Sequence, residues 1–173
     1  MSATDDIMAE LPIGQIAQQL GVDEQTAEAA ARHALPALLL GMDANAKDPA
    51  GAASLEQAIG QHDPSLIEGG VNLGDVDTAD GEKIVGHVFG DNSDQVMHAI
   101  GGSSGAGGNV MAKLLPILAP IVLSYLAKRV SGSGGGLGGL LGQVLSGAGQ
   151  ASGQGGGGSL GDILGGLLGG GRR

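Results

Sequence analysis

The chain has 173 residues, enough for one domain with a hydrophobic core, and 36 of them are glycine. It contains no cysteine, which excludes disulfides, thiolate nucleophiles and cysteine-based metal sites. With one tyrosine, one phenylalanine and no tryptophan, its core must be built from aliphatic side chains.

The net charge of −10 is distributed unevenly. Residues 1–109 carry 17 acidic and 3 basic side chains, whereas residues 110–173 carry 1 acidic and 5 basic ones. An acidic first part disfavours nucleic-acid binding, because that binding depends on neutralising phosphates. The segment Met1–Asp6 lacks the basic and apolar regions of a secretory signal, so we expect a cytoplasmic location.

Hydrophobic spacing predicts three helices in the first fifty residues. The first is a short helix that includes Ile7–Leu11 and stops near Pro12, and the second covers Ile13–Leu20. Gly21 should end the second helix, and Asp23 should cap a long third one. The apolar stripe of the third helix is expected to be buried; it consists of Ala27, Ala30, Ala31, Ala34, Leu35 and Leu38.

The middle of the chain combines capping signals with short helices. Asp48-Pro49 and Asp63-Pro64 predict two helix starts. A loop at Val71–Ala79 then leads into a helix at Gly81–Phe89, which we expect Asp80 to cap. The expected buried side of that helix is Ile84, Val85, Val88 and Phe89.

A further short helix precedes the most apolar part of the chain. It presents Val96, Met97 and Ile100, and Asp91 or Ser93 is expected to cap it. The glycine-rich segment Gly101–Gly108 is predicted to be a flexible connector.

The most apolar continuous segment is Asn109–Val130. Its uncharged run of fourteen residues, Leu114–Ala127, is shorter than the roughly 20 residues of a bilayer span. Lys113, Pro116 and Pro120 weaken the membrane interpretation further. We therefore expect a core helix surrounded by other helices.

Shifted by eighty residues, the chain partly repeats itself: Gly21 falls on Gly101, and Pro36 falls on Pro116. This spacing predicts an all-α fold, a multihelical orthogonal array of two related modules at 1–48 and 80–130, joined by 49–79. Chance similarity in a Gly/Ala/Leu-rich chain is the alternative. Together the modules make a domain at 1–130, and residues 131–173 form a Gly/Leu-rich tail.

Four segments carry a resemblance to a known family. They are Ile84–Gly90, Val96–Gly101, Leu114–Val122 and the Gly/Leu tail that ends in Arg172-Arg173. In these segments the chain resembles the YidB-like family, a bacterial family of unknown function. The resemblance covers residues 80–173 well and the first half more loosely. It implies an all-helical fold and a bacterial source, and it brings no catalytic residues.

The segment Ile16–Ala27 has the spacing of a helix-turn-helix motif. A helix that reads DNA displays Arg, Lys, Asn or Gln toward the bases and phosphates. Here the exposed positions offer mainly acidic residues such as Glu24 and Glu28, with Arg32 as the only cation. The pattern therefore predicts the turn and argues against DNA binding.

No catalytic or metal-binding pattern emerges from the sequence. Asp75, Asp77 and Asp80 suggest a calcium loop, but the glycine and glutamate that an EF-hand needs at positions 6 and 12 are missing. The four histidines, His33, His62, His87 and His98, lack the spacing of metal ligands. Ser103-Ser104 lacks the strand-turn-helix setting of a nucleophile elbow. We expect no enzymatic activity, no metal and no cofactor.

The tail contains two apolar stripes with helical spacing, which are the candidate interaction residues. The first stripe is Leu137, Leu140, Leu141, Val144 and Leu145, and the second is Leu160, Ile163, Leu164, Leu167 and Leu168. Interior glycines cost about 1 kcal/mol each relative to alanine, so such helices should form only when docked. The chain's own core, another copy, another protein and a membrane surface are the possible supports. The scarcity of cations before Arg172 favours protein over lipid.

From these observations we expect a non-enzymatic protein-binding or self-assembly module that forms homo-oligomers. Two alternatives stay open: a helix-turn-helix protein associated with transcription, and a peripheral membrane-surface protein. The expected partner is another copy of the chain or another protein, rather than nucleic acid or a membrane.

Overall fold

The computed structural model describes residues 2–133. These residues form helices and contain no strand, which confirms the all-α prediction. The α-helices are α1 (Ala3–Glu10), α2 (Ile13–Leu20), α3 (Glu24–Ala46), α4 (Pro49–Gln61), α5 (Thr78–Phe89), α6 (Ser93–Ser104) and α7 (Gly108–Ser133). The short 3-10 helices are η1 (Pro64–Ile67), η2 (Leu73–Asp75) and η3 (Gly90–Asn92).

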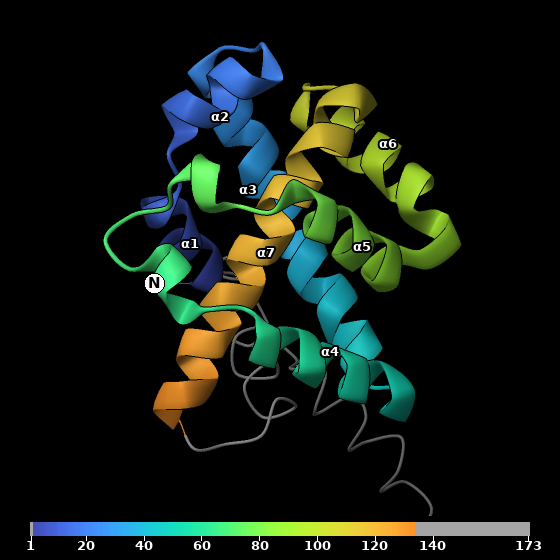
Figure 1. Ribbon diagram of the computed structural model, residues 1–173. Coiled ribbons are helices and arrows are strands. Elements are labelled where there is room, and N and C mark those ends of the chain that lie inside the picture. The colour runs from blue at the N-terminus through green and yellow to red at the C-terminus, as the bar shows by residue number, and fades with distance from the viewer. Residues whose placement is uncertain (1, 134–173) are drawn as a thin grey trace, which may run out of the picture.

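Helix α7 is the centre of the fold. Every residue from Leu114 to Ala127 is buried, and each of the helices α1 to α6 contacts α7. In Figure 1, α7 runs through the middle of the molecule, with α3 crossing it and α5 and α6 to one side. By length and composition alone, Gly108–Gly132 could cross a membrane, yet 83% of its apolar window is buried inside the protein. The prediction of a core helix is confirmed.

The first helices follow local sequence signals. α2 has the predicted bounds, and Gly21 ends it in the left-handed conformation with φ 72°. The Asp23 side chain accepts a hydrogen bond from Thr26 N at 2.9 Å and so caps α3 as predicted. All six residues of the predicted stripe of α3 are fully buried.

Helix α1 begins at Ala3, before the residues Ile7–Leu11 that were predicted to belong to it. Ser2 Oγ accepts a hydrogen bond from the backbone N–H of Asp5, and the Asp5 carboxylate accepts one from the backbone N–H of Ser2. This reciprocal capping box satisfies two N–H groups that would otherwise lack partners at the helix start. The helix therefore extends back to Ala3.

The capping predictions for α5 and α6 are wrong. Asp77, not Asp80, caps α5, because its carboxylate accepts a hydrogen bond from Asp80 N at 3.1 Å. The residue before α6 is Asn92, which makes no side-chain capping bond, and η3 leads directly into that helix. The predicted loop at Val71–Ala79 contains η2 and the first residues of α5.

The buried side of α5 is only partly as predicted. Ile84 and Val85 are buried, whereas Val88 and Phe89 are partly buried and pack against the edge of the core. Both side chains lie over Gly41 of α3, where a Cβ would overlap Val88. Phe89 therefore covers a contact between α3 and α5 and does not fill the centre.

The glycine-rich segment Gly101–Gly108, predicted to be a connector, lies partly within the helices on either side. α6 continues through Gly101 to Ser104, and the left-handed residue that ends it is Gly105, with φ 72°. A Cβ at Gly101 would overlap the backbone of Gly107, so this glycine permits a close approach of two backbone segments. Gly21 and Gly105 are thus the two left-handed glycines that end α2 and α6. The predicted repeat had instead placed Gly21 on Gly101, four residues earlier. Common origin of the two modules stays a prediction.

Candidate functional site

The ten tail residues that sequence analysis singled out lie outside the described residues. The first stripe is Leu137, Leu140, Leu141, Val144 and Leu145, and the second is Leu160, Ile163, Leu164, Leu167 and Leu168. The last described residue, Ser133, belongs to α7 and directly precedes the tail segment. Within residues 2–133, a candidate binding surface is a recess lined by apolar side chains.

A groove between α4 and α5 offers such a surface. Its cavity has a volume of about 270 Å³ and reaches down to α7. The apolar floor of this α4–α5 groove is Leu55, Ala58, Ile84, Val88 and Leu123. Its polar rim is Asn45, Ser54, Gln57, Gln61, Asp80, Lys83 and His87.

Asn45 fixes one end of the groove. Its Nδ2 group donates to the backbone oxygens of His87 and Val88, at 3.0 and 3.1 Å, in the last turn of α5. These carbonyls have no N–H partner within their own helix, so the side chain acts as a cap from another element. Gly51 in the first turn of α4 lies so close that a Cβ would overlap the Asn45 backbone oxygen. The ends of α3, α4 and α5 are thereby held together.

His62 fixes the other end. Its Nε2 lies 3.0 Å from Asp80 Oδ2 in the first turn of α5, and its Nδ1 lies 2.7 Å from the backbone oxygen of Ala58. Both neighbours are hydrogen-bond acceptors, so each ring nitrogen faces an oxygen. The side chain is only 13% exposed. His62 therefore ties the end of α4 to the beginning of α5.

The groove combines an apolar lining with polar groups around it. Aliphatic side chains make the floor, and the charged or amide groups lie at the rim. Within residues 2–133, no three His, Asp or Glu side chains converge as metal ligands would. The aspartates of the suggested calcium loop act locally, with Asp77 capping α5 and Asp80 facing His62.

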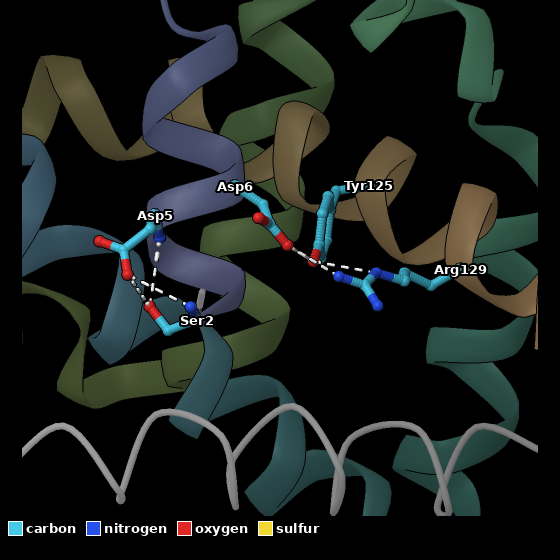
Figure 2. A network of polar contacts seen from close by, with 5 residues as sticks. All are labelled: Ser2, Asp5, Asp6, Tyr125 and Arg129. Carbon is cyan, nitrogen blue, oxygen red and sulfur yellow. Dashed lines mark hydrogen bonds and ion pairs between the residues drawn. The ribbon is translucent and has the colours of Figure 1, made fainter.

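A second polar arrangement joins the two ends of the described chain (Figure 2). Tyr125 donates its hydroxyl to Asp6 Oδ2 at 3.0 Å, and Arg129 Nε donates to the Tyr125 oxygen at 3.0 Å. Arg129 also pairs directly with Asp6 at 2.7 Å, and its guanidinium carbon lies 5.2 Å from the centre of the Tyr125 ring. We call these three residues the Tyr125 latch. It fastens α1 to the last turns of α7.

The latch borders a cavity of about 340 Å³, which Glu10, Ile67 and Lys128 also line. Burial of the hydroxyl and its hydrogen bond to Asp6 raise the pKa of Tyr125 above its usual value. The tyrosine therefore stays a neutral donor to Asp6 over a wide range of pH. The Tyr125 latch thus has a structural role, in which it holds α1 against α7 just before the tail begins.

Sequence reasoning missed both arrangements. Gln57 and Gln61 on α4, like Asp80 and His87 on α5, have the spacing of residues on one helix face. That spacing could have identified each polar face separately. It could not show that the two faces meet, because contacts between helices are not encoded in local periodicity.

A model of the family described as "Bacterial protein of unknown function (DUF937)" matches residues 5–129. The match includes both walls of the α4–α5 groove and the Tyr125 latch, and it stops before the tail. No match was found among curated proteins or among solved structures. The resemblance to the YidB-like family is consistent with this result. The chain thus belongs to the bacterial family of unknown function DUF937.

Proposed function

We propose that this chain is a non-enzymatic protein-binding module that self-associates through the apolar stripes of its tail. The observation that supports this proposal is the α4–α5 groove, a cavity whose apolar floor lies between two polar walls. Among residues 2–133, Leu40, at 56%, is the one large hydrophobic residue that is highly exposed, and it lies outside this groove.

The energetics of the tail support the same proposal. A ten-residue helix with several glycines is marginal by itself in water. Burying five aliphatic side chains stabilises such a helix by roughly 1.5–3 kcal/mol each before the loss of chain entropy is subtracted. Each stripe therefore gains order by lying on another surface. A chain with two such stripes can contact two surfaces at once.

The test is the mass of the full chain in solution by light scattering, over a range of concentrations. We expect a mass above the 16.8 kDa of one chain. The double variant Leu141→Asp and Leu164→Asp introduces a charge into each stripe. Because burying an unpaired carboxylate is costly, this variant should be monomeric.

The matched control is the double variant Gln143→Asp and Gly165→Asp, which adds the same charge beside the stripes. It should keep the mass of the unmodified chain. A full chain that is monomeric at every concentration would contradict self-association, as would equal masses for the two double variants.

A helix-turn-helix role is the second candidate, supported by the arrangement of α2, the turn Gly21–Asp23 and α3. Its electrostatics are unfavourable, because Arg32 is paired with Glu28 at 2.9 Å on the exposed face of α3. Retention on DNA that weakens steeply with added salt would support this role. Passage through a DNA column at low salt would dismiss it.

A further inference from the structure

We propose that the first tail stripe, residues 137–145, docks into the α4–α5 groove of its own chain, leaving the second stripe for other copies. This inference rests on the proposed function and assigns different partners to the two stripes. It is carried by the position of the groove relative to the end of α7, and by the chemistry of groove and stripe.

The groove can be reached from the end of α7. Leu123, on the floor, lies ten residues before Ser133, so the groove begins about 15 Å back along the helix. The chain from Ser133 to Leu137 spans at most about 14 Å. If the chain after Ser133 turns back along α7, the middle of the first stripe reaches the level of Leu123. Short connections between neighbouring antiparallel helices are usual in helical proteins.

The groove fits side chains rather than a whole helix. A cavity of about 270 Å³ is slightly smaller than the usual ligand pocket of roughly 300–1,000 Å³. A short helix lying across the rim could insert Leu137, Leu141 and Val144 between α4 and α5. Their neighbours on the floor would be Leu55, Ile84 and Val88.

The chemistry of the segment matches that of the groove. Residues 137–145 contain no charged side chain, so none has to be paired or buried on docking. The amides of Gln57 and Gln61 at the rim can meet the backbone of a docked segment, whose terminal N–H and C=O groups need partners. The segment that carries the second stripe, residues 160–168, contains Asp162, whose charge would add to that of Asp80.

Connection within one chain favours the nearest segment. A short linker gives an effective concentration in the millimolar range, and that concentration falls as the linker lengthens. The first stripe begins four residues after Ser133, whereas the second begins twenty-seven residues after it. The first stripe therefore occupies the groove, and the second is available for self-association.

The absence of native cysteine allows a direct test in the full chain. One cysteine replaces Gly138, beside the first stripe. A second replaces Gln57 on the α4 rim or Lys83 on the α5 rim, and a short thiol-to-thiol crosslinker is added. We expect a crosslink within one chain for at least one of the two pairs, identified by mass spectrometry of the peptides.

The matched control places the second cysteine at Glu56, the residue before Gln57, which is exposed and does not line the groove. The groove pair should react about tenfold faster than this control pair. Adding Leu141→Asp to the groove pair should remove the difference. Equal rates for groove and control pairs would overturn the proposal, and so would crosslinks that form only between chains.

Light scattering on the same proteins separates this inference from the proposed function. We expect Leu141→Asp alone to remove the difference in crosslinking rate and to keep the assembled mass. Leu164→Asp alone should keep the difference in crosslinking rate and reduce the mass to that of one chain. An assembled chain without the crosslink contrast overturns only the docking inference. A monomeric chain with the crosslink overturns only self-association.

Discussion

Gly81 of α5 lies directly against the backbone carbonyl oxygen of Pro116 in α7, so closely that a Cβ at position 81 would overlap that oxygen. Pro120 has no N–H group and therefore leaves this carbonyl without its normal partner four residues along α7. The glycine lets α5 approach this part of α7, where a Cα–H group can lie near the free oxygen. The central helix thus combines a proline that frees a carbonyl with a glycine that covers it.

Replacing this glycine should loosen the contact between α5 and α7. We expect Gly81→Ala to lower the free energy of unfolding by about 2 kcal/mol, because one of the two backbones has to move. Urea unfolding followed by circular dichroism measures the change. Gly86→Ala on the same helix is the control, since a Cβ there meets nothing within 4 Å. It should raise stability by up to about 1 kcal/mol, and a similar loss for both variants would contradict the packing argument.

Ser124 provides a second test of packing within α7. Its side chain is fully buried, and its Oγ has no hydrogen-bond partner among residues 2–133. A buried polar group without a partner is destabilising, so Ser124→Ala should raise the free energy of unfolding by about 1 kcal/mol. Ser131, whose hydroxyl donates to the Ala127 oxygen, is exposed, and Ser131→Ala should change stability by less than about 0.5 kcal/mol. A loss of stability in Ser124→Ala would show that the hydroxyl has a partner.

The Tyr125 latch can be followed by absorbance, because Tyr125 is the only tyrosine and the chain has no tryptophan. Burial and the bond to Asp6 raise its pKa, so the phenol should titrate above pH 10 in the folded protein. Because the folded pKa is above the unfolded one, the associated stability is present below pH 10 and is lost as pH rises through the folded pKa. Tyrosinate absorbance near 295 nm measures the midpoint.

Asp6→Asn should lower that midpoint, since it removes the acceptor carboxylate. The control is Asp5→Asn, because Asp5 is one residue away on α1 and bonds to Ser2 and not to Tyr125. It should leave the tyrosine titration where it is. Equal midpoints in the two variants would contradict the role of Asp6.

The helix caps predict the behaviour in acid. Hydrogen bonds from Thr26 lower the pKa of Asp23, and those from Ser2 and Ser65 do the same for Asp5 and Asp63. Groups with a depressed folded pKa stabilise the protein above their unfolded pKa, near 3.8, and that stability is lost as pH falls through the folded pKa.

Asp23→Asn tests this directly, because asparagine caps a helix equally well and does not titrate. We expect nearly unchanged stability at pH 7 and a shallower loss below pH 4, measured as thermal midpoints by circular dichroism. Asp23→Ala removes the cap itself and should lower the midpoint at neutral pH as well. If the thermal midpoints of the unmodified chain and of Asp23→Asn fell equally below pH 4, the role of this carboxylate would be contradicted.

Some features of this protein are determined by the sequence alone. The bounds of α2, the left-handed Gly21, the Asp23 cap and the buried stripe of α3 all follow from residues within a few positions of each other. The burial of Leu114–Ala127 follows from composition, because an uninterrupted aliphatic helix of this length needs cover on all sides. Local hydrogen bonding and hydrophobicity suffice for these features.

Other features were decided only by the tertiary structure. The sequence predicts Asp80 as the cap of α5, but Asp77 caps this helix and Asp80 is paired with His62 at the end of α4. Gly101 resembles a helix terminator, yet it lies within α6 because another backbone segment packs on it. The α4–α5 groove likewise forms where two helices meet, and the contacts of Asn45 with His87 and of His62 with Asp80 join residues far apart along the chain. Such contacts depend on which helix surfaces meet in three dimensions. The spacing of residues along one helix does not determine which other helix packs against it.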